Sequence, residues 1–597
     1  MNQSSERFTP LDERIAVWGM AFFFLLAPFF PQLVHHDFAF AFRSFIVLLF
    51  ALGLMRLGAS EWLGAIRSHP LGAPAAAWLA GLLAAVTYSP YLYGALGHLA
   101  LMISLFLLFW VLHRGPIQPH QRQWLVIAFA AGALMAAVHA LFIQWQGHGE
   151  IIQTIQESGY YAGEMKRELI RALEENRALG RFGNPNHLAA YLVMGLWAAW
   201  WLGYQRPTVR GKLLWGLVGL VCLAGVYQTF SRSGLLIALM SLALMLGFAL
   251  YRRGVRLSWR MALALLLLPV LVVIGLIVFL PPELFGGRLL ALSTVQARLH
   301  FYRGALLIIQ EFPLWGAGVS GFEGYYAEVL RPGDIETRYV HNFLLEAAVE
   351  GGVILFALTV WLAAAGMKFL VHQLRADPIT AFAALGAGLS LMMASMVDFH
   401  NRLFEMWLGP LLLLSAVGAG QAVKPLRVPK WVNAAVLILL LIAWTGLIGL
   451  RYANQYSRMA GHAYMLDQRN SQARQAYQQA VTFDPTDAES WRQLGLLWMQ
   501  VPIQSAQQQG LSCLETAVEW APLRASFHVD YADALLAMGY PQKALEEIEA
   551  ALNLFPSRPQ YYQRAARLYR ALDLTQAAEQ AEQTAEQLQQ QIEENRP

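Results

Sequence analysis

Charged residues are scarce in this sequence. Asp, Glu, Lys and Arg make up 14% of its 597 residues, whereas a soluble globular domain carries roughly 25%. This deficit excludes an ordinary soluble enzyme. Hydrophobic residues reach 57%, and a mean hydropathy of +0.41 over this length requires many separate apolar stretches. The composition therefore predicts an all-α, polytopic membrane protein.

Cysteine is also nearly absent, and the net charge is small. The two cysteines, Cys222 within an apolar run and Cys513 far downstream, exclude a disulfide framework, zinc fingers and iron–sulfur ligation. A net charge of +4 is too small to indicate nucleic acid as a partner, and the basic residues lie in short clusters between apolar runs. We expect these clusters to reflect membrane topology.

About thirteen apolar stretches have the length that a helix needs to cross a hydrocarbon core of about 30 Å. They lie near residues 15–34, 40–57, 71–90, 95–113, 123–144, 187–203, 213–229, 234–251, 261–280, 342–366, 379–397, 405–421 and 431–450. The first stretch lacks a small-residue cleavage site, so we expect it to remain as a start-transfer helix.

The distribution of lysine and arginine indicates how the chain is oriented in the membrane. Short loops that are rich in these residues are retained on the cytoplasmic side. Lysine and arginine are concentrated in one alternate set of loops, whereas the short loops of the other set contain only Arg232 and Arg402. The N-terminus is therefore predicted to be cytoplasmic. An odd number of spans then places the C-terminus on the outer side of the membrane.

These features divide the chain into six predicted segments. They are transmembrane helices at 1–144, a periplasmic loop with an amphipathic helix at 145–186, transmembrane helices at 187–280, a large periplasmic loop at 281–341, transmembrane helices at 342–450, and a periplasmic repeat domain at 451–597. The three periplasmic segments are too long to be simple connectors. We therefore expect the function to reside there.

The last segment has the composition of a helical repeat. Its residues change to Gln, Glu, Ala and Arg, and Pro485, Pro522 and Pro556 recur at close to the roughly 34 residues of a tetratricopeptide unit. Small Ala and Gly residues allow two helices to pack closely, and proline ends the second. The pattern predicts a short tetratricopeptide array. It is either a concave docking surface for an acceptor or partner protein, or a helical cap that stabilises and orients the membrane part.

Arginines at the predicted outer border are candidate anion ligands. An arginine in or beside a span costs roughly 2.5–3.5 kcal/mol and persists mostly where it faces a cavity or a partner. Arg232 lies in a tight turn between two spans. The alternative to an anion ligand is an arginine whose side chain snorkels to the membrane interface. Arg298 and Arg303 lie in the large loop, ahead of the glycine-rich stretch 316–321. Backbone N–H groups of such a turn can point toward an anion.

A histidine stands where the large loop returns to the membrane. His341 and Asn342 open a predicted helix, whose N-terminal partial charge disfavours imidazolium and keeps the ring able to accept a proton. Asn342, Glu346 and Glu350 repeat every four residues, so they share one face, which we expect to look into the bundle. A capping or interfacial histidine is the alternative.

Four segments together resemble the O-antigen ligase superfamily, which comprises lipopolysaccharide O-antigen ligases, O-antigen polymerases and bacterial protein O-oligosaccharyltransferases. They are the Gly-x-Phe-x-Asn-Pro-Asn-x-x-Ala turn at 180–189, the Ser-Arg-Ser-Gly turn at 231–234, the Arg298 segment that runs into Pro-Leu-Trp-Gly-Ala-Gly at 313–318, and the His-Asn-x-x-Leu run from His341 to Gly351. The resemblance covers residues 180–420, and the order of the four segments agrees with it.

The resemblance implies a membrane glycosyltransferase. A preassembled glycan would move from a polyprenyl pyrophosphate to an acceptor hydroxyl on the periplasmic face. Arg232 and Arg298 would bind the departing pyrophosphate, since guanidinium binds such anions bidentately without titrating. His341 would activate or orient the acceptor hydroxyl. Arg303 is close enough in sequence to make the contact assigned to Arg298.

Further polar residues of the outer turns are candidate substrate ligands. They are Asn184, Asn186, His187, Glu350, Asp398 and Arg402. The outer loops contain no Asp-x-Asp motif, so we expect a reaction without metal or other cofactor, in which arginines supply the positive charge. The adjacent His35, His36 and Asp37 have metal-ligand chemistry, but an interfacial turn is the simpler interpretation.

The acceptor and the wider function class leave alternatives. The acceptor is a lipid A-core or a periplasmic protein such as a pilin. A polymerase would have little need of a tetratricopeptide domain. A transporter or lipid-linked-glycan flippase is favoured by Arg43 inside the second span, but it would gather its ionisable residues near the bilayer midplane. A membrane scaffold would leave Arg232, Arg298 and His341 without a reason to coincide.

Overall fold

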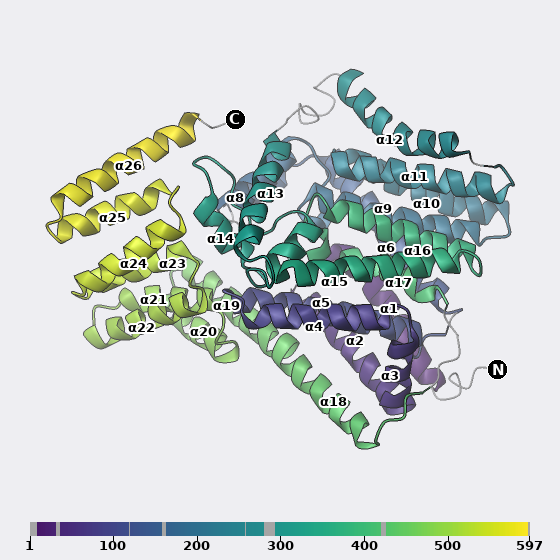
Figure 1. Cartoon of the computed structure of the whole chain (residues 1–597), viewed down its shortest axis with the longest axis horizontal. Helices are drawn as coiled ribbons and strands as arrows, with labels where there is room; N and C mark the ends of the chain where they lie inside the picture. The colour runs from purple at the N-terminus through teal and green to yellow at the C-terminus, as the bar shows by residue number, and fades with distance from the viewer. Residues whose placement is uncertain are drawn as a thin grey trace. The chain divides into compact units, whose positions relative to one another are not determined.

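The computed structural model describes residues 9–30, 36–118, 120–157, 163–256, 258–279, 293–418 and 425–594. Throughout these ranges the regular structure is helical (Figure 1), which confirms the predicted fold class. Residues 281–292 of the predicted large loop lie outside the described residues, as do residue 280 and His35. The chain forms two compact units. Met1–Ala76, Leu101–Leu292 and Trp361–Ile442 make the first, and Ala77–Ala100, Ser293–Val360 and Ala443–Pro597 make the second.

The first unit is mainly a bundle of apolar helices, joined by the more polar α7 (Gly149–Glu157) and α8 (Gly163–Glu174). Its other helices are α1 (Pro10–Leu26), α2 (His36–Leu57), α3 (Ala59–Ser68), α6 (Arg122–Gln146), α9 (Pro185–Tyr204), α10 (Val209–Gln228), α11 (Arg232–Arg252), α12 (Trp259–Phe279), α16 (Pro378–Ser395) and α17 (Phe404–Ala416). Four helices have residues in both units: α4 (Gly72–Thr87), α5 (Leu92–Arg114), α15 (Phe343–Gln373) and α18 (Trp431–Trp444).

Helix α9 is the central helix of the first unit, and it packs against α6, α10, α11, α16 and α17. Its residues are buried along nearly its whole length, because it is apolar on every side. The Trp197 indole N–H lies 3.1 Å from the Ser241 hydroxyl of α11 and 3.0 Å from the Ser390 hydroxyl of α16. A buried indole is stabilised by such a partner. Gly195 lets α6 approach, since a Cβ there would lie 2.4 Å from that of Ala133.

Each of the thirteen predicted apolar stretches falls on a helix of the structure. Among the described residues, eight helices are long and apolar enough to cross a membrane, or nine if α3 and α4, which are bent by 100° relative to each other, form one broken span. Helix α17 is shorter, with 13 residues. The count of about thirteen spans, the N-in and C-out orientation and the six-part division of the chain remain predictions.

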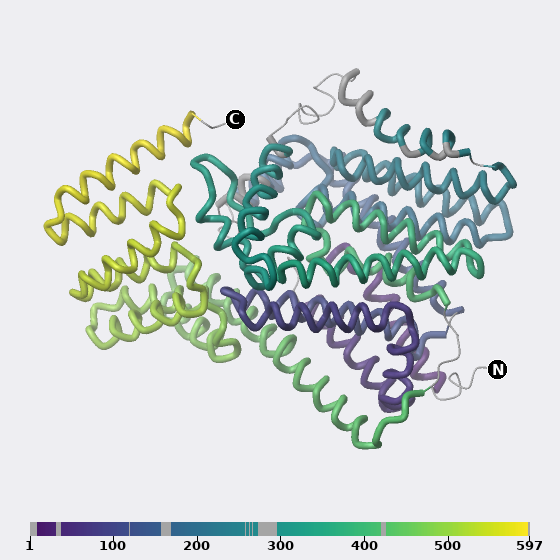
Figure 2. Tube along the Cα trace, in the orientation of Figure 1, coloured from purple at the N-terminus to yellow at the C-terminus, as the bar shows by residue number. Residues whose placement is uncertain are grey.

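The second unit holds the large loop and the repeat array. The loop contributes α13 (Ser293–Glu311) and α14 (Phe322–Val329). The array contains α19 (Arg451–Leu466), α20 (Asn470–Phe483), α21 (Ala488–Met499), α22 (Gln504–Trp520), α23 (Ala525–Ala537), α24 (Pro541–Leu554), α25 (Pro559–Ala571) and α26 (Thr575–Glu594). Figure 2 shows the chain reversing direction from one array helix to the next.

The array helices pack in successive pairs, as tetratricopeptide repeats do. Small residues permit the close contacts that the sequence predicted. Gly495 of α21 faces α22, where an added Cβ would lie 2.8 Å from Leu514 and 2.9 Å from the Gly510 carbonyl oxygen. The first pair, α19 and α20, follows α18 without a break, through a π-helical turn at Thr445–Leu450.

The array packs directly against the large loop. Buried residues of the loop, including Phe301, Tyr326 and Val340, form one hydrophobic cluster with array residues such as Val529 and Leu535. Burial of such a cluster is the main stabilising contribution to a fold.

Ion pairs follow the same contact between the loop and the array. Glu323 accepts from Arg524 of the array at 2.9 Å and from Arg338 of the loop at 3.5 Å. Arg558 of the array pairs with Glu336 of the loop. The negative charge of Glu323 raises the pKa of Arg338. The array therefore supports the loop that carries Arg298 and His341.

Candidate active site

The predicted turn at residues 184–187 forms the N-terminus of α9. The Asn184 side chain accepts a hydrogen bond from the Asn186 N–H at 2.8 Å, and Pro185 occupies the first helical position. Asparagine at the cap and proline after it are the preferred start of a helix. His187 follows inside the bundle with 1% of its surface exposed, and its ring lies edge-on to Phe399 at 4.9 Å.

Arg232 is the first residue of α11, directly after the N-cap residue Ser231. The Ser231 hydroxyl accepts from the Gly234 N–H at 3.2 Å. Phe230, just before the cap, has φ +48°, a left-handed conformation that is uncommon for a residue with a side chain. The structure thus contains the tight turn between two apolar helices that the sequence predicted, and Arg232 is partly exposed at that end of α11.

Three polar turns of the first unit meet around Asn186. The Ser231 hydroxyl donates to the Asn186 Oδ1 atom at 2.8 Å, and the Asn186 Nδ2 atom donates to Asp398 at 3.0 Å. The His400 Nε2 atom lies 3.2 Å from the Asn186 carbonyl oxygen. Arg402 is buried in the same short helical turn as His400, with 8% of its surface exposed. His400 has no sequence signal beyond its place in a polar turn.

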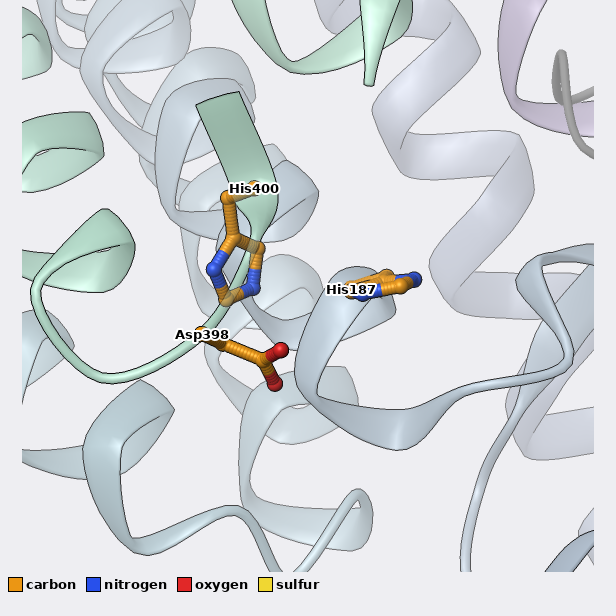
Figure 3. Close-up of side chains that lie close together, drawn as sticks. All are labelled: His187, Asp398 and His400. Atoms are coloured by element: carbon orange, nitrogen blue, oxygen red, sulfur yellow. The ribbon is translucent and has the colours of Figure 1, made fainter. Parts of the chain in front are cut away.

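His187, Asp398 and His400 form a cluster with metal-ligand chemistry. Figure 3 shows the two rings and the carboxylate side by side, with His187 on α9 and the other two on the turn after α16. One ligand atom of each lies within 4.8 Å of the others, and all three residues are buried. No local spacing in the sequence indicated that these three residues would meet.

Hydrogen bonds already engage two members of this cluster. Both ring nitrogens of His400 lie 3.2 Å from backbone carbonyl oxygens, those of Ala394 and Asn186. The Asp398 oxygens accept from the Asn186 side chain and from the Phe399 N–H. A metal ion would have to compete with these hydrogen bonds, so the donor set fits a polar cluster at least as well as a cation.

Helix α13 carries the two candidate arginines of the large loop. Arg298 is partly exposed, and within the described residues no carboxylate pairs with it. Arg303 is exposed. Phe301, between them, is buried and stacks on the His341 ring at 5.2 Å with an interplanar angle of 26°. Tyr302, one turn beyond Arg298, donates to the His341 carbonyl oxygen at 3.4 Å. This packing brings the predicted histidine against the helix of the predicted arginines.

His341 adopts a strained backbone in front of α15. Its φ is +58°, and Asn342, the next residue, caps the helix by accepting from the Leu344 and Leu345 N–H groups at 3.1 Å each. The His341 Nε2 atom lies 3.2 Å from the Thr337 hydroxyl oxygen. A left-handed non-glycine residue costs on the order of 1–3 kcal/mol and is typical of functional sites. The histidine is therefore held at the helix start, while Asn342 does the capping.

The glycine-rich turn does not form the anion cradle that the sequence suggested. The Ala317 N–H donates to the Val349 carbonyl oxygen at 2.7 Å, and the Gly318 N–H donates to that of Glu350 at 3.1 Å. The Ser320 N–H donates to the Glu350 carboxylate at 2.9 Å. These amides are used by α15, so they are not available to an anion. Glu350, with 4% of its surface exposed, braces this turn.

His300 of α13 gave no functional signal in the sequence. The His300 Nδ1 atom lies 2.7 Å from Asp334, which ties α13 to the loop segment before His341. Burial, together with the nearby Asp334 charge, raises the pKa of Tyr326. The partner of His300 is 34 positions away, so no local spacing could have indicated this pair. We assign it a structural role in holding the loop.

Comparison with known families and structures agrees with the resemblance of the four segments. The O-antigen ligase family matches residues 217–360, a stretch that includes Arg232, Arg298 and His341. Tetratricopeptide repeat families match residues 461–501 and 525–568. No curated protein matches the chain.

Two solved structures illustrate the level of structural similarity. The crystal structure of MamA is 17% identical, covers 29% of this chain and 99% of its own, and has a TM-score of 0.23. The Cut9–Hcn1 hetero-tetramer of APC/C is 12% identical, covers 79% of this chain and 87% of its own, and has a TM-score of 0.22. At these TM-scores the similarity supports no argument about fold or function.

Proposed function

We propose that this protein is a membrane glycosyltransferase. The premise is that residues 217–360 are an O-antigen ligase domain followed by tetratricopeptide repeats. The protein transfers a preassembled glycan from a polyprenyl pyrophosphate to an acceptor hydroxyl at the periplasmic face of the bacterial inner membrane. The observation that carries the proposal is the place of three residues in the matched stretch. Arg232 is the first residue of α11 and Arg298 lies on α13, and both side chains are partly exposed. His341 has a strained, left-handed backbone.

The two arginines suit a diphosphate leaving group. As the bond between the anomeric carbon and the phosphate oxygen breaks, negative charge develops on the departing pyrophosphate. Guanidinium binds such oxygens bidentately and stays charged at any physiological pH. Groups that stabilise charge developing in a transition state contribute roughly 2.7–4 kcal/mol each. Arg303, exposed on the same helix as Arg298, is a further candidate ligand of the donor.

His341 supplies the proton acceptor. The acceptor hydroxyl oxygen forms the new bond to the anomeric carbon, and its proton passes to the imidazole while the lipid pyrophosphate leaves. The stacking of the ring on Phe301 and the Thr337 hydroxyl near Nε2 fix the orientation of the ring. General base catalysis by a positioned side chain contributes typically 10²–10⁴-fold. In this scheme, arginine charge takes the role that a metal ion plays elsewhere, and no cofactor is needed.

The repeat array supports the site. Because its helices share a hydrophobic cluster and ion pairs with the loop, we assign the array a stabilising and orienting role, and acceptor docking on its remaining surface is compatible with that role. The acceptor is a lipid A-core or a periplasmic protein such as a pilin. A polymerase would share the donor chemistry and use a second lipid-linked glycan as its acceptor.

Deletion of the gene tests the proposal and identifies the acceptor. Lipopolysaccharide banding and the mass spectra of periplasmic glycoproteins are compared with and without the gene, and loss in one of them names the acceptor class. Complementation with Arg232→Ala or Arg298→Ala should reduce transfer about 10²–10³-fold, and with His341→Ala about 10²–10⁴-fold. Arg252→Ala, at the opposite end of α11, is the control and should restore transfer. Full transfer by all three site variants would refute the proposed function.

A further inference from the structure

The turn in front of Arg232 is held by a segment 45 to 52 positions earlier in the sequence. The Arg177 Nε atom donates to the Thr229 carbonyl oxygen at 2.9 Å, and the Ala178 N–H donates to that of Gln228 at 3.0 Å. Arg177 is buried, with 7% of its surface exposed. Phe230 lies within this turn, and its left-handed backbone costs on the order of 1–3 kcal/mol. Surrounding contacts must supply that energy.

Asn186 is hydrogen-bonded to Ser231, the residue before Arg232. Its Oδ1 atom accepts from the Ser231 hydroxyl at 2.8 Å, and its Nδ2 atom donates to the Asp398 carboxylate at 3.0 Å. A serine hydroxyl has one donor and two acceptor positions. Ser231 therefore donates to Asn186 and still accepts from the Gly234 N–H, which caps α11. The two hydrogen bonds reinforce each other at the residue before Arg232.

The chemistry on either side fixes the orientation of the Asn186 amide. Its oxygen faces a hydroxyl donor and its nitrogen faces a carboxylate, which only accepts. The hydrogen bond to the carboxylate is charge-assisted and so stronger than a neutral one. The backbone of Asn186 is engaged as well, by the Asn184 side chain and by His400. Both ends of the side chain are thus used within the protein.

We propose that Asn186 is a positioning residue for Arg232 and not a ligand of the substrate. It fastens the start of α11, through Ser231, to the Asp398 turn, so that the guanidinium of Arg232 is presented from a fixed helix start. This inference rests on the proposed function, in which Arg232 binds the donor pyrophosphate. It replaces the substrate-binding role that the sequence suggested for Asn186. Pre-organisation by such surrounding hydrogen bonds is what gives a binding residue its geometry.

An exchange of the two side chains tests the proposal. Asn186→Asp alone places two carboxylates 3.0 Å apart, and Asp398→Asn alone removes one of the two acceptor oxygens that the Asn186 amide and the Phe399 N–H use. Each should lower kcat/KM for the lipid-linked donor about tenfold to hundredfold, the effect of leaving a buried polar group without its partner. The double variant restores all three hydrogen bonds and reverses the donor and acceptor only in the bond between positions 186 and 398, so it should recover most of the activity.

The double variant also separates positioning from direct contact. A carboxylate at position 186 would repel a diphosphate, so a substrate-binding Asn186 could not be replaced by Asp even in the double variant. A folded double variant as inactive as Asn186→Asp would overturn the proposal. We further expect the KM for the acceptor to be unchanged in all three variants, because the exchange acts through the donor-binding arginine. A changed acceptor KM with an unchanged donor kcat/KM would equally overturn it.

Ser231 provides a second test if the Asn186→Asp protein does not fold. Ser231→Thr keeps the hydroxyl that caps α11 and donates to Asn186, whereas Ser231→Ala removes both hydrogen bonds. Threonine should retain transfer and alanine should lose it by at least tenfold; equal activity of the two would contradict the proposal. Arg232→Ala is measured in parallel. If it retains full transfer, the donor-binding role of Arg232 in the proposed function fails, whereas an inactive Arg232→Ala with no rescue by the exchange overturns the positioning role alone.

Discussion

Gly352 gives the sharpest test of how the loop is seated on α15. The helix is broken at Gly351 (φ −134°, ψ 19°) and Gly352 (φ 62°, ψ −161°). The break admits the turn after α13, and the Val353 N–H donates to the Pro313 carbonyl oxygen at 2.9 Å. A Cβ at Gly352 would lie 2.2 Å from the Leu314 carbonyl oxygen, which belongs to that turn. Gly352→Ala therefore forces either the break or the turn to move.

The expected cost has two parts. The backbone region of Gly352 is almost exclusive to glycine, and a side chain there costs on the order of 1–3 kcal/mol. Overlap with a backbone atom that cannot rotate away adds about 1–3 kcal/mol. The alanine variant should thus lose roughly 2–6 kcal/mol of stability. Because the turn links α13 to α15, we also expect a large loss of glycan transfer.

A glycine in an open part of the fold provides the matched control. Gly388 lies inside α16, and nothing lies within 4 Å of a Cβ built there. Alanine in a helix interior is favoured over glycine by roughly 0.5–1 kcal/mol, so Gly388→Ala should melt at or slightly above the wild-type temperature. The assay is the apparent melting temperature in detergent, followed by intrinsic fluorescence, with transfer measured in parallel. The reasoning would be refuted if the Gly352→Ala protein had the same apparent melting temperature as Gly388→Ala and transferred glycan normally.

Three further predictions concern the array, a thiol and the metal-free mechanism. Arg524→Ala removes the ion pair with Glu323 of the loop. It should lower transfer more than Arg564→Ala, which removes an ion pair with Asp533 within the array. Both variants should lose less than about 1 kcal/mol of stability, and equal transfer by the two would argue against an orienting array. Burial raises the pKa of Cys513 from 9.0 to about 11. At pH 8 its thiolate fraction is therefore about 100-fold below that of a free thiol, and it should rise about tenfold per pH unit. Alkylation by iodoacetamide is followed by mass spectrometry, and equal rates for the native and unfolded proteins would contradict this. Chelator treatment should leave transfer unchanged, and loss of activity with recovery on adding a divalent cation would point to the cluster in Figure 3 as a metal site.

Features that depend on neighbours in sequence were predictable. The Asn-Pro-Asn turn, the Ser231 cap and the place of His341 and Asn342 before α15 all follow from local cap and turn chemistry. The helical class and the repeat array follow in the same way from composition and periodicity. Each of these signals is contained within one or two turns of chain or repeats at a fixed spacing.

Features that depend on tertiary contacts were not predictable. Glycines at 316 and 318 were interpreted as an anion cradle because they permit exposed amides, but the Gly316 N–H donates to the Phe312 carbonyl oxygen and the Gly318 N–H to that of Glu350 in α15. Asn186 was interpreted as a substrate ligand, yet its amide partners lie 45 and 212 positions away. A single sequence shows which hydrogen-bonding groups a turn offers, and only the packing shows which of them the protein uses itself.

The shared cluster of loop and array has a consequence for how the chain is made. Glu323 and its partner Arg524 are separated by 201 positions in the sequence. Phe301 belongs to a hydrophobic cluster whose array residues are more than 201 positions further along the chain. Since domains are synthesised from the N-terminus, α13 and α14 wait with apolar surface uncovered until the repeats have been completed, which exposes the nascent chain to aggregation. A chain shortened before α23 would lack most of that cover, because most array residues of the cluster lie in α23, α24 and α25. We therefore expect the loop that carries Arg298 and His341 to fold fully only after α23, α24 and α25 have been synthesised.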